Sequence, residues 1–238
     1  MAIVEVRKLV KDYGNFHAVK GISFDVNEGE IFGLIGPNGA GKTTTLRVLA
    51  TLIEVTSGTV KICGFDLINE PERVREVISY LPEDAGAYKN MTGREYLRFV
   101  SQFFGDKAKS EGMIEDGIRV ADLGERIDDK IETYSKGMMR KLLVARALMV
   151  NPKLAILDEP TSGLDVINAQ EIRRLIRETA RKGMSVLLSS HNMLEVELVC
   201  DRIALIDDGR IVESGTPRAL RQKYNASNIE EVFVSVVS

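Results

Sequence analysis

The sequence predicts an α/β fold in which a mostly parallel sheet carries helices on both faces. The second half alternates strand-like and helical stretches: KLAILD (153–158) is followed by AQEIRRLIRETARKG (169–183) and then by SVLLSS (185–190). Such alternation favours parallel strands joined by helical crossovers. EIFGLIG (30–36) is a continuous apolar run of the kind that is buried on both faces of a sheet. A glycine-rich turn joins this run to a predicted helix at 43–53.

The first 90 residues combine that central strand with several shorter ones. Alternating apolar and polar residues predict strands over 3–10 and 21–26, separated by turn-forming residues. TSGTVKICGFDL (56–67) predicts a hairpin, and VISYLP (77–82) predicts another buried strand. We therefore expect an N-terminal antiparallel β-subdomain beside the main sheet.

Residues 91–150 differ in character, because apolar residues recur there at helical spacing. The predicted helices cover 94–104, 112–124 and 137–150. We interpret the segment as a helical subdomain inserted into a core of about residues 1–90 and 151–222. Within that core we also expect a helix at 192–200, a strand at 202–207 and a hairpin at 207–215. Residues 223–238 are expected to be a short C-terminal tail, so that the domain spans 1–222.

Composition and charge place the chain among ordinary globular proteins. Its 238 residues are 44% hydrophobic and 28% charged, and its net charge of −3 gives no electrostatic footprint for nucleic acid. The first residues lack the apolar core of a secretory signal, and the apolar runs fall short of the ~20 residues that span a bilayer. We expect a chain that is soluble by itself, with Cys63 and Cys200 as reduced thiols.

Residues 36–43 match the pattern G-x-x-x-x-G-K-[ST] between a predicted strand and a predicted helix, the context that this pattern requires. Glycines let consecutive backbone N–H groups wrap a phosphate, and the helix directs its N-terminal dipole at the same anion. Lys42 adds a positive charge at the β- and γ-phosphates, and the Thr43 hydroxyl can ligate Mg²⁺ with Thr44 in support. The motif predicts a P-loop NTPase (RecA-like) core. The predicted phosphate-binding residues are Gly36, Pro37, Asn38, Gly39, Ala40, Gly41, Lys42, Thr43 and Thr44.

The stretch LAILDEP places Asp158 and Glu159 at the C-terminal end of a predicted buried strand. Ligands bind at that edge in open parallel sheets. We expect Asp158 to hold Mg²⁺ and Glu159 to be the general base that orients and deprotonates the attacking water. Taken alone, the stretch equally fits an exposed acidic turn capped by Pro160, and the phosphate loop is what favours a site.

A third motif points to a family. TYSKGMMRKLLVARAL (133–148) lies just before the acidic strand and resembles the signature motif of ATP-binding cassette (ABC) ATPases, usually Leu-Ser-Gly-Gly-Gln. Here the motif reads Tyr134-Ser135-Lys136-Gly137-Met138. With GPNGAGKTTTLR and LDEPTSGLD, it makes the chain similar to ABC transporter ATPase subunits from about residue 3 to residue 222. LPEDAGAY, YSKGM and NIEEVF are most similar to the cassettes of drug-, antibiotic- and ion-efflux exporters.

The resemblance implies roles for further residues. Tyr13 in KDYG corresponds to the aromatic that stacks on adenine, Asp165 in SGLD to the D-loop at a dimer interface, and His191 to the switch histidine near the γ-phosphate. Residues 135–137 would hold the γ-phosphate of an ATP molecule bound by a second chain. From the residues alone, Tyr13 also fits surface packing and Asp165 also fits helix capping. The implied catalytic residues are Glu159, His191 and Lys42.

The chain departs from the family pattern at three positions. Glu83, in YLPED, occupies the place of the Q-loop glutamine. Its carboxylate can approach Mg²⁺ through oxygen but cannot donate a hydrogen bond when ionised, so it is either a metal contact or a solvated loop acid. Lys136 replaces a signature glycine, as a cation near the partner's γ-phosphate or in solvent, and Met138 replaces the glutamine. Efflux-type cassettes share this Lys and Met pattern, so it does not indicate a loss of activity.

The resemblance implies a subunit that binds and hydrolyses ATP with Mg²⁺ and dimerises around two ATP molecules. Closing and reopening of the pair would drive transport, in the export direction, through separate transmembrane permease subunits at the cytoplasmic face of the cell membrane. The second ATPase subunit is either another copy of the chain or a paralogue. AGAYKNM (85–91) is either the contact with the permease or an ordinary surface loop.

The alternative function is that of a soluble ABC-type ATPase that acts on ribosomes or nucleic acid. Ribosome-associated members carry two cassettes in one chain, and DNA-repair members carry long coiled-coil insertions. This chain has one cassette, a helical segment of only about 60 residues and an acidic charge balance. These features favour transport, with no nucleic acid among the expected partners.

Overall fold

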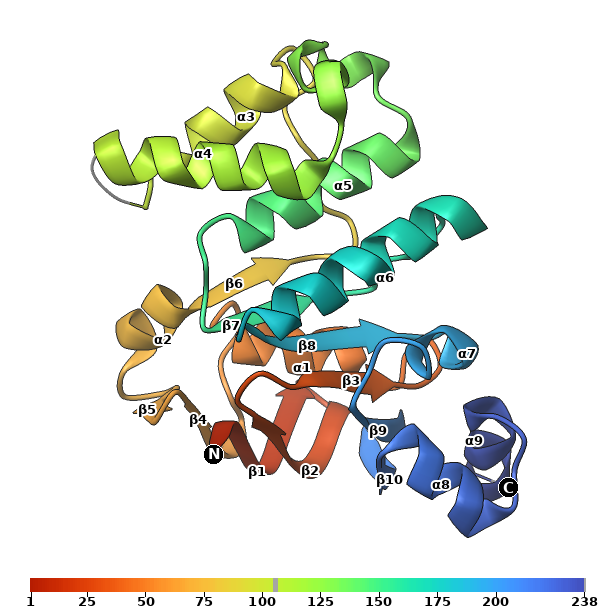
Figure 1. Ribbon diagram of the computed structural model, residues 1–238. Coiled ribbons are helices and arrows are strands. Elements are labelled where there is room, and N and C mark those ends of the chain that lie inside the picture. Colours follow the sequence, from red (N-terminus) through yellow and green to blue (C-terminus); the bar gives the residue numbers. More distant parts are fainter. Residues whose placement is uncertain (105–106, 238) are drawn as a thin grey trace.

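A computed structural model describes residues 1–104 and 107–237 of the chain, as two β-sheets with helices around them (Figure 1). Residues 105–106, in the predicted helical segment, and residue 238, in the predicted tail, lie outside the described residues. The strands are β1 (Ala2–Tyr13), β2 (Phe16–Asn27), β3 (Ile31–Ile35), β4 (Ser57–Ile62), β5 (Phe65–Asp66), β6 (Ile78–Leu81), β7 (Leu154–Leu157), β8 (Ser185–Ser190), β9 (Arg202–Asp207) and β10 (Arg210–Gly215). The α-helices are α1 (Lys42–Leu49), α2 (Pro71–Val77), α3 (Gly93–Ser101), α4 (Lys107–Ala121), α5 (Lys136–Leu148), α6 (Val166–Arg181), α7 (Met193–Val196), α8 (Pro217–Tyr224) and α9 (Ile229–Val237). Two short 3-10 helices are η1 (Gly124–Asp128) and η2 (Ile131–Thr133).

The two sheets confirm the predicted fold class. The N-terminal sheet has the strand order β2-β1-β4-β5, and its neighbours pair antiparallel. The main sheet has the order β10-β9-β3-β8-β7-β6 and is parallel from β9 to β6, with β10 antiparallel at one edge. Parallel pairing brings the carboxyl ends of these strands to one edge of the sheet. The loops after β3, β7 and β8 therefore lie near one another.

Strand β3 shows how the main sheet is buried on both faces. Ile31 and Ile35 pack into a cluster with residues of α5 and α6. Phe32 and Leu34, which point the other way, pack with residues of α1, β1 and β2. All four side chains are at most 3% exposed, and burying each contributes roughly 1.5–3 kcal/mol to folding. This explains why the strand reads as a continuous apolar run.

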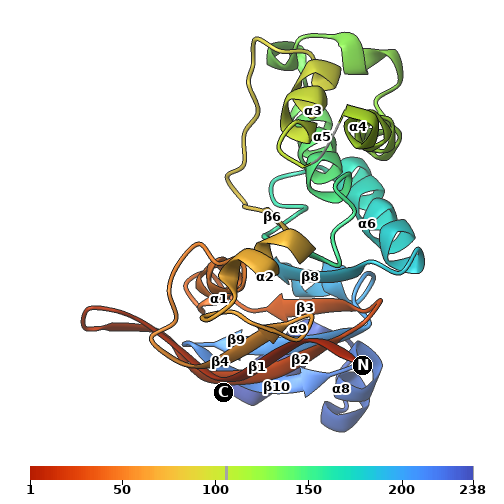
Figure 2. The same cartoon turned by 90° about the vertical axis from the view of Figure 1, so that its left-hand side faces the viewer.

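The helices from α3 to α5 stand together above the main sheet, with α6 between them and β8 (Figures 1 and 2). Helix α3 begins at a capping box, in which the Thr92 hydroxyl accepts from the Glu95 N–H and the Glu95 carboxylate accepts from the Thr92 N–H. The boundaries 91–150 for a separate helical subdomain remain a prediction. Across residues 1–104 and 107–237, no helix combines the length and the apolar character needed to cross a bilayer.

Several predicted helix limits were wrong. Helix α1 ends at Leu49 rather than at 53, because Thr51 adopts a left-handed conformation with φ of 59°. Helix α7 covers only Met193–Val196 of the predicted 192–200, and α4 begins at Lys107 rather than at 112. Helix α2 was not predicted.

The C-terminal segment, which includes the predicted tail, packs against the main sheet. Its helices α8 and α9 contact each other and β10, and Ile229 and Val232 are fully buried in the main core cluster. The two cysteines, Cys63 and Cys200, are free thiols in the described structure, and burial raises the pKa of Cys200.

Candidate functional site

The phosphate loop lies between β3 and α1, as the motif predicts, and its backbone passes very close to other segments. A Cβ atom on Gly36 would lie 2.0 Å from the Ile206 carbonyl oxygen. Gly41 has φ of 102°, and a Cβ there would lie 2.6 Å from the Ala18 carbonyl oxygen. Real Cβ contacts are never this short, so both positions require glycine.

Helix α1 starts directly at Lys42, and none of the described side chains caps its first turn. The backbone N–H groups of that turn therefore face the loop, where they and the helix dipole favour an anion. The Lys42 ammonium donates to the Gly36 carbonyl at 2.8 Å and to the Pro37 carbonyl at 3.1 Å. The phosphate loop thus holds the ammonium through two of its own carbonyl groups.

Asp158 follows β7 and is completely buried. Its Oδ1 accepts from the Ser189 hydroxyl at 2.5 Å and from the Thr43 hydroxyl at 3.2 Å, and its Oδ2 accepts from the Tyr80 hydroxyl at 3.4 Å. Burial raises the pKa of Asp158, and burial together with the Asp158 charge raises the pKa of Tyr80 to about 12. Two of the three residues predicted to contact Mg²⁺, Thr43 and Asp158, are therefore hydrogen-bonded to each other.

The Glu159 carboxylate lies between two of the other predicted catalytic residues. Its Oε1 is 3.5 Å from the Lys42 ammonium, and its Oε2 is 2.9 Å from His191 Nδ1. The side chains of Glu159 and Lys42 are each 5% exposed, whereas that of His191 is 45% exposed. Among the described atoms, Glu159 Oε1 is buried without a hydrogen-bond partner. The imidazole holds Oε2, and Oε1, on the side of the Lys42 ammonium, is left available for a further donor.

Ser189 is a site residue that the motifs do not identify. Its hydroxyl donates to Asp158 and accepts the Glu159 N–H at 3.0 Å, so it ties β8 to both acidic residues. Its side chain is fully buried. The available signal was a pair of serines closing the otherwise apolar stretch SVLLSS, directly before His191.

Glu83 lies in the exposed loop after β6. Its Oε1 accepts from the Ser162 hydroxyl at 3.2 Å, which connects this loop to the segment before α6. Within the described residues there is no cluster of three or more His, Cys, Asp or Glu side chains arranged for a metal ion. A contact between Glu83 and Mg²⁺ remains a prediction.

The signature residues lie at the start of α5, where Ser135 and Lys136 are exposed and Gly137 is buried. The Ser135 hydroxyl caps this helix by accepting from the Met138 N–H at 3.2 Å. Lys136 lies against Gly163, where an added Cβ would be 2.1 Å from its ammonium. Gly137 packs against Asn168 so closely that a Cβ would be 2.2 Å from the amide oxygen. The start of α5 therefore packs closely against the residues around the start of α6.

Asp165 caps α6, and the capping role is the one that the structure describes. Its Oδ1 accepts from the N–H groups of Ile167 and Asn168, both at 3.0 Å. These hydrogen bonds lower the pKa of Asp165. The residue is exposed, and a contact across a dimer interface remains a prediction.

Tyr13 lies at the tip of the β1–β2 hairpin, which projects from the body of the molecule (Figure 2). The residue is 47% exposed, and the Lys11 ammonium lies 5.1 Å from its ring centroid. Further along the same hairpin, Ala18 contacts the phosphate loop at Gly41. The hairpin therefore connects the predicted adenine-stacking residue to the phosphate loop, and stacking itself remains a prediction.

The phosphate loop and the signature residues occupy different levels of the same side of the molecule. The carboxyl ends of β3 and β8 and the starts of α5 and α6 all face the right of Figure 1. In that view α6 and β8 lie between the start of α5 and the end of β3.

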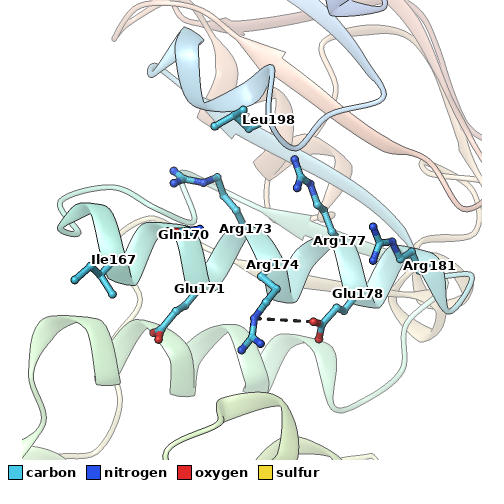
Figure 3. A pocket seen from close by; sticks show the side chains of 9 residues that line it. All are labelled: Ile167, Gln170, Glu171, Arg173, Arg174, Arg177, Glu178, Arg181 and Leu198. Atoms are coloured by element: carbon cyan, nitrogen blue, oxygen red, sulfur yellow. Dashed lines mark ion pairs between the residues drawn. The ribbon is translucent and has the colours of Figure 1, made fainter.

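A separate groove of about 830 Å³ runs along α6 (Figure 3). It is lined by Ile167, Gln170, Glu171, Arg173, Arg174, Arg177, Glu178, Arg181 and Leu198. Arg173 and Arg177 point toward Leu198, while Arg174 pairs with Glu178 at 3.9 Å. None of the predicted site residues lines this groove, so it is distinct from the phosphate-binding region.

Comparisons with known proteins agree with these motifs. A family model described as "ABC transporter" matches residues 19–162. The linearmycin resistance ATP-binding protein LnrL of Bacillus subtilis (strain 168) is 35% identical over 237 residues, which cover 99% of this chain and 76% of that protein. The Nod factor export ATP-binding protein I of Burkholderia orbicola (strain AU 1054) is 35% identical over 234 residues, which cover 98% of this chain and 77% of that protein. A solved ATP-binding subunit of an ABC transporter matches with a TM-score of 0.87 and 30% identity, over 99% of this chain and 100% of that one.

Proposed function

The chain belongs to the ABC transporter family as an ATP-binding subunit with ATPase activity, and on that premise we propose how its residues divide the work. One surface, around the phosphate loop, binds the triphosphate and carries the catalytic base. A second surface, at the start of α5, completes the corresponding site of another cassette. The observation that carries this proposal is the position of Glu159 between Lys42 and His191.

The triphosphate binds at the phosphate loop. The uncapped N-terminus of α1 supplies backbone N–H donors, and the Lys42 ammonium exchanges its two carbonyl partners for phosphate oxygens. Tyr13, half exposed on the projecting hairpin, stacks on the adenine. Residues 36–44 form the cradle.

Mg²⁺ fits the oxygen ligands beside this loop. Thr43 and Asp158 come from different elements yet already touch through a hydroxyl–carboxylate hydrogen bond of 3.2 Å. Hard oxygen donors of this kind, completed by phosphate oxygens, are what Mg²⁺ prefers. The bound ion would neutralise charge on the phosphates. Glu83 would approach the ion from the exposed loop after β6, and its carboxylate would then give up the hydrogen bond from Ser162.

Glu159 is the general base. One of its carboxylate oxygens is buried without a hydrogen-bond partner among the described atoms, so it can accept a proton from the attacking water. His191 contacts the other oxygen and, being partly exposed, reaches toward the γ-phosphate. His191 thus fixes the carboxylate and positions the water.

The start of α5 provides the second surface. Ser135 and Lys136 are exposed at the N-terminus of α5, with Gly137 buried directly after them, and this helix start suits the γ-phosphate of an ATP molecule held by another chain. Because this surface and the phosphate loop lie apart in one chain, two chains arranged head to tail around two ATP molecules use both surfaces twice. The second chain is another copy or a paralogue.

The transport step requires transmembrane permease subunits, and the relatives named for linearmycin resistance and for Nod factor export favour the export direction. Residues 85–91 supply the contact with the permease, at the cytoplasmic face of the cell membrane. Tyr88 is 54% exposed there and packs edge-on against Tyr96 and Phe99 of α3. This gives the helical subdomain, about residues 91–150, an aromatic face that a partner helix can cover.

The dependence of ATPase activity on protein concentration tests the shared site. Specific activity should rise with concentration and then level off, because only paired chains are complete. Glu159→Gln should lower turnover by about 10²–10⁴-fold, the usual contribution of a general base, while ATP binding persists. A constant specific activity at all concentrations would contradict the shared site, and near-normal turnover of Glu159→Gln would contradict the assignment of the base. Co-purification with a protein of several membrane spans tests the transport role.

A further inference from the structure

We propose that Arg140, on α5, is a positioning residue that holds the backbone of Glu159 in the conformation needed for catalysis. The proposal rests on the assignment of Glu159 as general base. It adds a mechanical link between the start of α5, where the second cassette's ATP binds, and the catalytic carboxylate. Arg140 lies within the stretch 133–148 that carries the family resemblance, but no role was assigned to this arginine from the resemblance.

Arg140 is 7% exposed, and its guanidinium is surrounded by backbone carbonyl groups. All five of its hydrogen bonds described here end on carbonyl oxygens from two separate segments of the chain. Nε donates to Pro160 at 2.8 Å, Nη2 to Glu159 at 2.6 Å and to Asp158 at 3.0 Å, and Nη1 to Glu83 at 3.1 Å and to Pro82 at 3.4 Å.

This arrangement explains an unusual backbone conformation. Glu159 has φ of 47°, in the left-handed region that residues other than glycine rarely occupy. In that conformation the carbonyls of three consecutive residues, 158–160, converge on one point. A planar cation with donors on several sides satisfies all three at once, and it offsets the repulsion between the carbonyl dipoles. From the other side, Ser189 accepts the Glu159 N–H, so both backbone polar groups of Glu159 are fixed.

The same guanidinium connects the backbone of Glu159 to two regions that the proposed cycle uses, the start of α5 and the loop after β6. Arg140 follows Ser135 by five residues on the same helix, so a shift of α5 displaces the guanidinium directly. Through Pro82 and Glu83, the guanidinium also holds the loop after β6. A change at either place therefore reaches the backbone of Glu159 through hydrogen bonds to one side chain.

Arg140→Lys is the direct test, because an ammonium keeps the charge but loses the planar fork. Arg146→Lys is the matched control: Arg146 lies on the same helix, is half-buried and donates to the Tyr80 carbonyl at 3.1 Å, without a described contact to Glu159. We expect Arg140→Lys to lower kcat for ATP by at least about 10-fold, with KM and the Kd for ATP changed by less than about twofold. Arg146→Lys should leave kcat unchanged, and both melting temperatures are measured to separate catalysis from folding.

A double-mutant cycle decides whether Arg140 acts through Glu159. In the Glu159→Gln background, Arg140→Lys should have almost no further effect on the residual turnover. The same fold-loss in both backgrounds would overturn the proposal, as would equal losses of kcat in Arg140→Lys and Arg146→Lys at equal losses of thermal stability.

If Arg140→Lys does not fold, Arg140→Gln is measured in the same way. Failure of both to fold, while Arg146→Lys folds, would also overturn the proposal, since Arg140 would then be a purely structural residue. If turnover survives Glu159→Gln in a chain that keeps Arg140, Glu159 is not the general base. Arg140 then has no catalytic residue to position.

Discussion

At the scale of single residues, the main feature of the site is that its charged side chains are buried. Lys42 and Glu159 are almost inaccessible to solvent, and Asp158 is completely so. Ionised side chains are costly to bury, and they persist only where partners compensate the charge. Here the compensation comes from hydroxyls, from His191 and from an ion pair at 3.5 Å that is not a hydrogen bond. A site held in this way gains little stability and is suited to receiving a charged ligand.

Lys42→Ala tests the phosphate cradle. The substitution removes the ammonium group that the phosphate loop itself supplies to the β- and γ-phosphates, so the affinity for ATP should fall by at least about 10-fold, the range of a lost charge-assisted hydrogen bond. A nucleotide titration followed by fluorescence or calorimetry measures this affinity. Arg47→Ala, at an exposed position on the same helix, is the control. An unchanged titration for Lys42→Ala would count against the cradle.

Asp158→Asn should stabilise the fold at neutral pH. Burial raises the folded-state pKa of Asp158 above its ordinary value of 3.8, so the folded chain holds this proton more tightly than the unfolded chain. The carboxylate therefore costs stability above the folded-state pKa, and the cost disappears as the pH falls toward about 4. Asparagine keeps an oxygen acceptor for Thr43 and Ser189.

Thermal unfolding of both proteins between pH 5 and pH 8 measures this effect. Each kcal/mol gained corresponds to about 2–4 °C in Tm for a chain of this size. The gain should be largest at pH 8 and should shrink toward pH 5. A gain that is larger at the acidic end would contradict the assigned direction of the pKa shift.

Residues that act through side-chain chemistry could be predicted from the sequence, whereas residues that act on the backbone could not. Lys42, Glu159 and His191 belong to motifs, and the topology brings the ends of β3, β7 and β8 together. Arg140 and Ser189 have no such signature, because their partners are carbonyl and N–H groups that every residue carries. Only the fold shows which backbone groups they reach.

At the scale of secondary-structure elements, the sequence pattern was misleading mainly at the ends of helices. Helix α1 ends in a Schellman-type arrangement, in which the Leu52 N–H donates to the Arg47 carbonyl and the Thr51 N–H donates to the Val48 carbonyl. The left-handed position in such a motif is usually glycine, but here it is Thr51. The apolar periodicity of 43–53 therefore gave no stop signal. Helices α8 and α9 were missed because their apolar faces are short and pack on each other and on β10.

Thr92→Ala tests the capping box of α3. Alanine cannot accept the Glu95 N–H, so the substitution should cost about 1 kcal/mol, or roughly 2–4 °C in Tm. Glu95→Gln keeps an acceptor for the Thr92 N–H and should cost less. Since α3 carries no residue assigned to ATP, turnover of the folded Thr92→Ala chain should match that of the wild type. A loss of turnover without a loss of stability would show a role for α3 beyond packing.

At the scale of the whole molecule, the phosphate loop and the start of α5, which we propose as the two halves of a shared site, lie on one side. The parallel sheet brings the phosphate loop, Asp158, Glu159 and His191 to a single edge. The helices above it hold the start of α5 at a different level, separated from the loop by α6 and β8 (Figure 1). The motifs and the strand–helix alternation predicted both surfaces and the fold class. What they could not predict is that α5 is tied to the catalytic edge by a buried arginine.

The most direct test of this account is the mass of the Glu159→Gln chain with ATP and Mg²⁺, measured by light scattering after gel filtration. Slow hydrolysis should trap the paired state, so we expect twice the 26.4 kDa of one chain. Adding Ser135→Arg to this variant, which blocks the start of α5, should return the mass to that of one chain while ATP binding persists. A Glu159→Gln chain that stays monomeric with ATP, even at high concentration, would contradict the head-to-tail sharing of ATP between two copies of this chain.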